Sequence, residues 1–260
     1  MSQQLASYLS FYGAAVSIIR PVIIMAILIG LWVALRRTDL TPAARTGTWL
    51  AVAVPLVTWF VLIWNVAVAG AFEASPGALP LLPVAILLPI MIALPLLMRS
   101  QRIAAAIDAA PASWLIGFQV YRVIGSNFLF LWAFGGAIPG AFALPAGLGD
   151  VLTGVLALVA AFYLASGAPH GRTMAIAWNF LGIADLICAV SLGAMTTPGP
   201  LQMLAFDQPN LLTSSYPSVL TPAFVVPLSV ILHTVSLWQL RRLGQRARTP
   251  ASGGHVVSAA

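Results

Sequence analysis

The sequence has very little charge: 7% of its 260 residues are charged, against about 25% in an ordinary soluble domain. Hydrophobic residues make up 60% of the chain, so a water-soluble fold is excluded. At about 20 apolar residues per bilayer crossing, the length leaves room for roughly eight or nine helices at most. No sizeable domain outside the membrane fits in addition.

The chain contains no lysine and only one cysteine, Cys188. The absence of lysine excludes any mechanism based on a lysine Schiff base, including that of a retinal pigment. A single cysteine excludes an intrachain disulfide. The formal charge of +6 comes entirely from arginine. Most arginines lie in short segments between apolar runs, which is typical of membrane topology and not of nucleic-acid binding.

Metal and cofactor chemistry has few ligands to draw on. Within the apolar runs only His233, Cys188 and two carboxylates are available, whereas a metal site needs three or four converging ligands. Haem held by two histidines is excluded because His170 and His255 fall in a loop and in the tail. We therefore expect no metal and no cofactor. No nucleophile elbow is present, and we assign no catalytic residue.

Seven apolar stretches are long enough to cross a membrane. The sequence therefore predicts an all-α integral membrane protein, a single bundle of seven helices that forms one domain over residues 1–242. We expect the basic segment 243–260 to be a disordered tail. The predicted spans are 11–35, 47–71, 77–98, 113–136, 145–167, 173–195 and 217–240.

The arginines predict the orientation of the bundle. Alternating the loops between the two sides places ten arginines on one side and none on the other, a strong positive-inside signal. The N-terminus is then outside and the C-terminus cytoplasmic, and we expect a multi-pass protein in a bacterial inner membrane. The ten are Arg36, Arg37, Arg45, Arg99, Arg102, Arg172, Arg241, Arg242, Arg246 and Arg248.

Three connecting segments are of interest. Residues 99–114 form either a short interfacial helix, with Asp108 toward water and Ile103 and Ile107 toward lipid, or an ordinary loop. The segment PAGLGD, which ends at Asp150, is expected to be a tight loop at the mouth of the fifth span. The long loop 196–216 mixes Pro, Gly and Asn with large apolar residues, and whether it is a lid stays open.

Five ionisable residues lie inside the predicted spans, where charges are costly and normally find partners in the bundle interior. They are Arg20, Arg122, Asp150, Asp185 and His233. From the rise of about 1.5 Å per helical residue we expect Arg122 to pair with Asp185, and Arg20 to pair with Asp150 or Asp185. His233 is either a neutral ring bonded to Ser229 or Ser236, or a titrating group coupled to Asp185.

Helical spacing places further polar residues beside these charges. Gln119, Arg122 and Ser126 form one stripe with Asn127 adjacent, and Asn179 and Asp185 share another. The second and third spans lack such stripes, so we expect them to be peripheral and spans four to seven to be the functional core. The candidate ligand-binding or proton-relay residues are Arg20, Gln119, Arg122, Asn127, Asp150, Asn179, Asp185 and His233.

Three functions remain open from the sequence. The first is a transporter, in which spans four to seven enclose a polar cavity that binds a small solute or conducts protons. The second is a non-catalytic membrane subunit or sensor, whose buried charges only fix the packing of the helices. The third is an intramembrane enzyme that acts on a hydrophobic substrate, with Asp185 and His233 as acid and base. The stretches YRVIGSNF, PAGLGD and WNFLGIADL are motif-like in each case.

Overall fold

The computed structural model describes residues 3–73, 81–134 and 136–248, and within these ranges it contains helices and loops but no β-strand. The predicted all-α fold is confirmed for these residues, and seven helical segments are long and apolar enough to span a membrane. They are Ser17–Arg36, Pro42–Val68, Leu81–Arg99, Ala112–Ala133, Gly140–Ala165, Gly171–Thr196 and Thr221–Arg246.

Two of the seven spans are not regular α-helices throughout. The fourth span consists of α5 (Ala112–Gly117), the 3-10 helix η1 (Phe118–Gly125) and α6 (Ser126–Ala133). The seventh begins with the π-helical turn η3 (Thr221–Val225) and continues as α9 (Val226–Arg248). The other elements are α1 (Gln3–Arg36), α2 (Pro42–Val68), α3 (Leu81–Arg99), α4 (Gln101–Ala109), α7 (Gly140–Ala165), α8 (Gly171–Thr196) and η2 (Leu212–Ser214).

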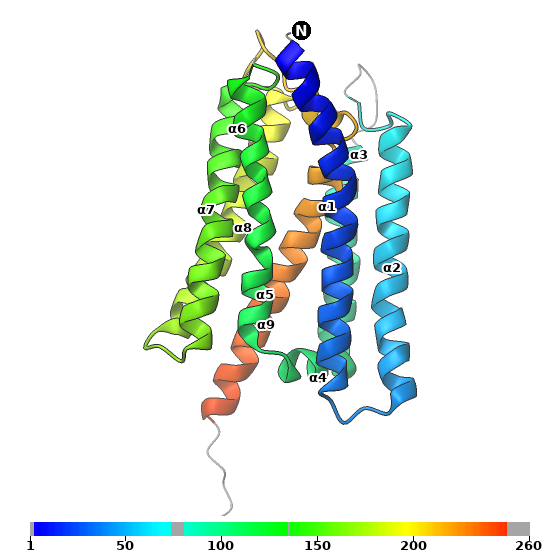
Figure 1. Cartoon of the computed structure of the whole chain (residues 1–260), viewed down its shortest axis with the longest axis vertical. Coiled ribbons are helices and arrows are strands. Elements are labelled where there is room, and N and C mark those ends of the chain that lie inside the picture. Colours follow the sequence, from blue (N-terminus) through cyan, green and yellow to red (C-terminus); the bar gives the residue numbers. More distant parts are fainter. Residues whose placement is uncertain (1–2, 74–80, 135, 249–260) are drawn as a thin grey trace, which may run out of the picture.

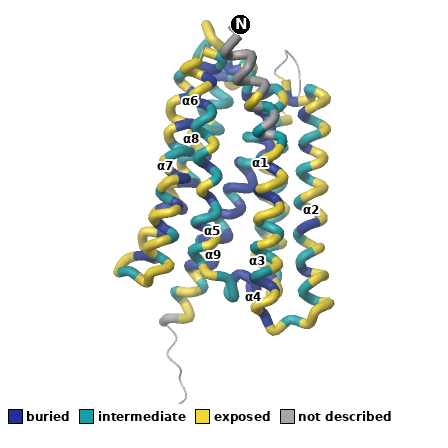
Figure 2. Tube along the Cα trace, in the orientation of Figure 1, coloured by how far each residue is buried: buried dark blue, intermediate teal, exposed yellow. Residues whose placement is uncertain are grey.

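The seventh span is the central element of the bundle. Helices α1, α2 and α3 stand on one side of it and α6, α7 and α8 on the other (Figure 1). In its most apolar stretch 72% of the residues are buried, whereas in the corresponding stretch of each other span the buried share is 28% or less. The buried residues of α9 form the dark centre of Figure 2. The second and third spans have the smallest buried shares, 17% and 6%, which confirms that they are peripheral.

Aromatic packing fixes η3 against α2. The Phe224 ring lies 4.5 Å from the Trp59 ring and 5.0 Å from the Phe60 ring, and its own side chain is fully buried. Such tilted and edge-on aromatic pairs add to the free energy gained by burying their area. The beginning of the seventh span is thus packed against α2, and the first residue of η3, Thr221, accepts a hydrogen bond from Arg20 of α1.

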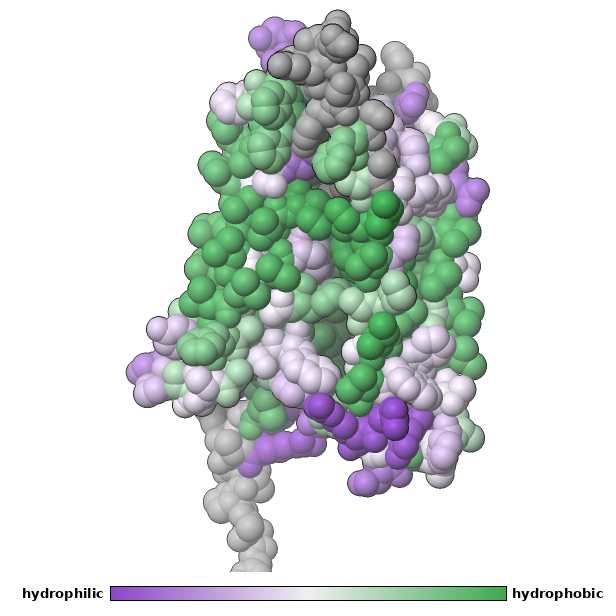
Figure 3. Space-filling model, in the orientation of Figure 1, coloured by the Kyte–Doolittle hydropathy of each residue, from purple (hydrophilic) through white to green (hydrophobic). Residues whose placement is uncertain are grey.

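One end of the bundle carries the arginine-containing loops, and we call it the arginine-rich end. Helices α1 and α3 finish there at Arg36 and Arg99, and hydrophilic residues gather at this end in Figure 3. Helix α4 lies at the same end (Figure 1). It begins where the Ser100 hydroxyl accepts a hydrogen bond from the amide of Ile103, a typical N-terminal cap.

The predicted orientation of α4 is wrong in two respects. Ile103 and Ile107 pack against Ile231 and Val235 of α9 instead of facing outward. Asp108 does not face water freely, because its carboxylate accepts hydrogen bonds from Arg242 and Arg246, and its side chain is only 8% exposed. The interior of the bundle therefore extends down to α4.

Two predicted boundaries also change. The segment PAGLGD is not a tight loop, because α7 begins at Gly140 and continues through Pro145 to Asp150 and beyond. At the other end, α9 continues to Arg248, past the predicted end of the helical domain at residue 242. Residues 249–260 of the predicted disordered tail lie outside the described residues.

Candidate functional site

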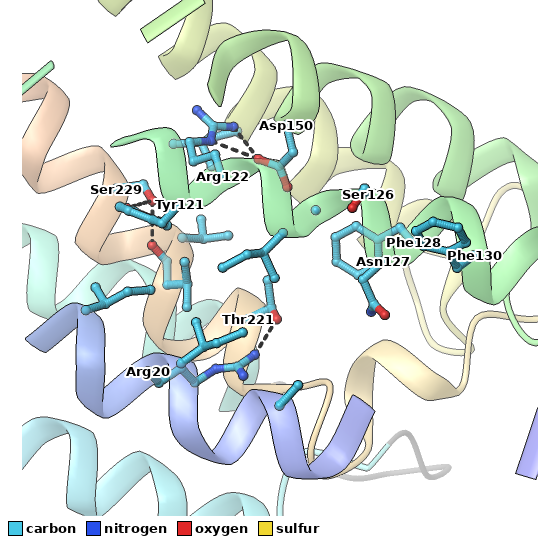
Figure 4. Close-up of a pocket in the computed structure, with 18 of the residues that line it drawn as sticks. Arg20, Tyr121, Arg122, Ser126, Asn127, Phe128, Phe130, Asp150, Thr221 and Ser229 are labelled. Carbon is cyan, nitrogen blue, oxygen red and sulfur yellow. Dashed lines mark hydrogen bonds and ion pairs between the residues drawn. The ribbon is translucent and has the colours of Figure 1, made fainter. Parts of the chain in front are cut away.

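Arg122, which η1 carries at the middle of the fourth span, is the centre of a buried polar cluster (Figure 4). Its Nε and Nη2 donate to Asp150 Oδ1 on α7 at 2.8 and 2.7 Å, and Nη2 also donates to Asp185 Oδ2 on α8. Its Nη1 donates to the Gly182 carbonyl at 3.1 Å and to His233 Nε2 on α9 at 3.3 Å. All five N–H donors of the guanidinium are used, and they tie η1 to three other helices.

The predicted pair of Arg122 with Asp185 is confirmed. The second predicted pair is wrong: both carboxylates bind Arg122, and Arg20 Nη2 donates to Thr221 Oγ1 at 2.6 Å. The depth estimate failed because it placed Asp150 at the mouth of its span, whereas Asp150 lies well inside α7. It also assumed a regular α-helix around Arg122, whereas a 3-10 helix rises about 2.0 Å per residue.

The directions of the hydrogen bonds define the state of His233. A guanidinium can only donate, so Nε2 of the ring accepts from Arg122, and the ring proton lies on Nδ1 and is donated to Asn179 Oδ1 at 3.0 Å. Asn179 Nδ2 then donates to Ser236 Oγ at 3.1 Å. The ring is neutral and fully buried. Its partners are Arg122 and Asn179, and not Ser229 or Ser236 as the sequence suggested.

The 3-10 geometry of η1 aligns the polar residues of the fourth span. Side chains three residues apart eclipse one another in a 3-10 helix, so Gln119, Arg122 and Gly125 share one face. The predicted stripe with Ser126 assumed an α-helix and is replaced by this one. Gln119 is fully buried, and its two amide atoms have no hydrogen-bond partner among the described residues.

Glycines leave the space that the charged side chains fill. A Cβ atom at Gly125 would overlap the Asp150 carboxylate, and one at Gly149 would overlap the Asp185 carboxylate. A Cβ atom at Gly182 would overlap the His233 ring. Each of the three motif-like stretches of the sequence thus contains a glycine whose lack of a side chain leaves room for an ionisable side chain of another helix.

A pocket of about 320 Å³ lies beside the cluster, between α1, the η1–α6 segment and the η3–α9 segment. Asp150 and Arg122 form part of its wall, and Asp185 and His233 lie behind that wall. Figure 3 shows the surface hollowed between α1 and α5–α6. The polar residues that line the pocket are Arg20, Tyr121, Arg122, Ser126, Asn127, Asp150, Thr221 and Ser229 (Figure 4).

The predicted site residues therefore fall into two regions, the pocket and the Arg122 cluster behind its wall. Arg20 and Asn127 line the pocket, Asn179 belongs to the hydrogen-bond chain of His233, and Gln119 lies buried on the same face as Arg122. Sequence reasoning missed Thr221, the acceptor for Arg20, as well as Tyr121, whose hydroxyl lies 2.7 Å from Ser229 Oγ. For Tyr121, the available signal was its position next to Arg122 in the predicted fourth span.

A family model described as "Domain of unknown function (DUF8737)" matches residues 79–241, more than half of the chain. The chain belongs to this family. The DUF8737 region contains the whole Arg122 cluster and the pocket wall formed by η1, α6, α7 and α9, whereas α1 and α2 precede it. No curated protein and no solved structure matches the chain.

Proposed function

We propose that this DUF8737 protein is a proton-coupled transporter of a small solute in a bacterial inner membrane, with its N-terminus outside and its arginine-rich end in the cytoplasm. The pocket is the solute site, and the Arg122 cluster is the coupling site. Support for the membrane comes from the seven apolar spans, and support for the orientation comes from the distribution of arginines.

One observation carries the proposal: a single buried guanidinium is shared by two carboxylates on different helices. The cluster of Arg122, Asp150 and Asp185 thus holds one more carboxylate than guanidinium. Such an excess inside a membrane is costly unless a proton or a cation joins it. The neutral His233 and the Tyr121 hydroxyl add no charge to the cluster.

The shared guanidinium also has two alternative arrangements. A proton on Asp150 removes its charge and weakens its hold on Arg122, which then pairs with Asp185 alone. Because Asp150 belongs to α7 and Asp185 to α8, this change shifts η1 relative to α7. Asp150 also lines the pocket, so its proton occupancy and the solute act on the same side chain.

The irregular helices lie where such a movement is needed. Both η1 and η3 contribute residues to the pocket wall, and 3-10 and π segments within long helices frequently mark hinges and functional sites. Discontinuous spans at mid-depth are also the usual binding sites of secondary transporters. This placement supports transport over a purely mechanical role for the buried charges.

The role of a non-catalytic subunit or sensor is favoured by one specific observation, namely that every donor of Arg122 is already used within the protein. The enzyme hypothesis has less support, because Asp185 and His233, its proposed acid and base, lie behind the pocket wall. We therefore keep the subunit or sensor as the second candidate, and transport assays separate it from the first.

The test uses purified protein in liposomes that contain a pH-sensitive dye. An inside-negative potential is imposed, and glucose, glycinamide and decanesulfonate are added outside in turn. We expect at least one of them to accelerate acidification of the lumen, and we expect Asp150→Asn and Arg122→Gln to abolish this effect. Arg102→Gln, a change at an exposed arginine of α4, is the control. Equal proton entry with wild type and both variants would overturn the proposal.

A further inference from the structure

A second group of polar side chains lies one helical turn from the Arg122 cluster, on the side of the arginine-rich end, and we call it the polar layer. Each of its members stands three residues from Arg122, Asp150, Gly182 or His233 on the same span. Residues at this spacing share one face of a helix. The members are Gln119 on η1, Thr153 on α7, Asn179 on α8 and Ser236 on α9, and none of them is more than 1% exposed.

Three atoms of the polar layer have no hydrogen-bond partner among the described residues. They are Nε2 and Oε1 of Gln119 and the hydroxyl oxygen of Thr153. A buried polar group without a partner is costly, and bound internal water is the usual partner of such groups in folded proteins. Asn179 and Ser236 already bond to each other. Gln119 and Thr153 are therefore the members of the layer that require water as a partner.

The polar layer and the pocket lie on opposite sides of the Arg122 cluster. On the fourth span the pocket is lined from Tyr121 onward, and on the seventh it is lined up to Ser229. The members of the polar layer on these two spans lie beyond both limits, nearer the arginine-rich end. Asp150 belongs to both regions, because it lines the pocket and stands one turn from Thr153 on α7.

The line of buried polar groups continues along α9 to the arginine-rich end. Gln239, one turn after Ser236, is 1% exposed and donates through Nε2 to the Ile107 and Ala110 carbonyls. Its Oε1 has no partner within the part of the chain that the structure describes. One turn later the Arg242 side chain is 30% exposed. From Ser236 to Arg242 the helix rises only about 9 Å, a distance that a few water molecules can bridge.

We infer that the polar layer binds a short file of water molecules, and that this file is the proton path between Asp150 and the arginine-rich end. The inference rests on the proposed function and names the route by which its proton leaves. The proton moves from the Asp150 carboxyl group to the oxygen of the nearest bound water, and each water then passes one proton to the next. The last water releases a proton at the arginine-rich end, and the Asp150 carboxylate binds Arg122 again.

Trp178 can report on this water because it lies beside the polar layer. Its Nε1 donates to the Thr153 carbonyl, its ring lies 4.8 Å from the His233 ring, and it is only 4% exposed. The test irradiates purified protein in nanodiscs with X-rays, which produce hydroxyl radicals from bulk and bound water alike. After correction for intrinsic reactivity, we expect Trp178 to be oxidised at least fivefold faster than Phe142, which is 5% exposed and lies in an apolar cluster.

Two variants remove the unpartnered polar atoms with little change in side-chain volume. Gln119→Leu and Thr153→Val should each lower the oxidation of Trp178 at least threefold and leave that of Phe142 unchanged. Thr48→Val is the matched control, because Thr48 is a buried threonine of α2 whose hydroxyl donates to a carbonyl of its own helix. Far-UV circular dichroism and size-exclusion chromatography establish that each variant is folded.

The liposome assay tests conduction by the same variants. The solute is whichever of glucose, glycinamide and decanesulfonate accelerates acidification with the wild type. Gln119→Leu and Thr153→Val should lower the maximal rate of proton entry at least fivefold. They should leave the half-saturating solute concentration unchanged, because both residues lie outside the pocket. Thr48→Val should match the wild type in both quantities.

Two results of the irradiation overturn the inference. They are oxidation of Trp178 no faster than that of Phe142, and oxidation of Trp178 that is unchanged in both variants. The flux results separate the two proposals. Proton entry that keeps its wild-type rate in both variants retains transport and refutes this path. Fast oxidation of Trp178 without proton entry in the wild type refutes transport and, with it, the conducting role of the bound water.

Discussion

At the scale of single residues, the most informative side chain is Arg122. Its five hydrogen bonds reach residues of α7, α8 and α9, and its side chain is almost completely buried. A buried ion pair is weak evidence for stability, because desolvation cancels much of the attraction. Removal of one partner is strongly destabilising, because it leaves the remaining charges buried without compensation.

The Arg122→Gln variant should therefore be destabilised by about 3–5 kcal/mol. Two carboxylates, Asp150 and Asp185, would remain in a site with no guanidinium. Adding Asp185→Asn should restore part of the loss, because one of the two stranded charges disappears. Thermal unfolding in detergent, followed by tryptophan fluorescence, measures both effects. A double variant no more stable than Arg122→Gln would contradict this account.

The glycines that support the cluster give a second prediction at the same scale. Gly182→Ala and Gly149→Ala should each cost about 1–3 kcal/mol, the usual penalty for overpacking. The new methyl group would overlap the His233 ring in the first case and the Asp185 carboxylate in the second. Thermal unfolding is again the measurement.

Gly30→Ala is the matched control for these variants. Gly30 is also helical, but a Cβ atom there would meet no atom within 4 Å. Its replacement should not lower stability, because alanine has the higher helix propensity. If all three variants behaved alike, the close approach of the glycines to the cluster would be irrelevant to stability.

At the scale of elements, the junction between α4 and α9 holds the arginine-rich end of the bundle together. Asp108 accepts from Arg242 and Arg246, and Gln239 Nε2 donates to the Ile107 and Ala110 carbonyls. The hydrogen bond from Arg242 and the positive charges lower the pKa of Asp108 below 3.8, against the opposing effect of partial burial. Because the pKa falls on folding, the carboxylate stabilises the fold at pH values above its unfolded pKa.

Asp108→Asn should therefore lower stability by about 1 kcal/mol, the size expected for a partly exposed ion pair. The difference from wild type should be constant between pH 5 and 8 and should shrink as the pH falls below about 4. Melting curves of both proteins across this range provide the measurement. Asp207→Asn, at an exposed loop residue of the opposite end, serves as control, and a difference that grew in acid would refute the assignment.

At the scale of the whole molecule, the proposed orientation can be tested directly. In a Cys188→Ala background, Asp207→Cys should react with an impermeant maleimide added to intact cells, and Ser166→Cys should react only after permeabilisation. Both positions are exposed and lie in loops at opposite ends of the bundle. The reverse pattern would invert the topology and would place the arginine-rich end outside.

The sequence by itself determined the seven apolar spans. The free energy of moving a segment from water into hydrocarbon is roughly the sum of contributions from its own residues, so a run of apolar residues is recognised without knowledge of its neighbours in space. The sequence also identified Arg122 and Asp185 as partners, since helical rise limits which buried charges can meet.

Only the tertiary structure decided that Asp150 completes this cluster, that Arg20 turns to Thr221, and that α4 faces the bundle. The place of Asp150 depends on the 3-10 segment and on glycines that leave room for neighbouring side chains, and that of Arg20 depends on the π-helical turn that carries Thr221. The orientation of α4 depends on its apolar contacts with α9. Such features arise from contacts between distant parts of the chain, which local periodicity does not encode.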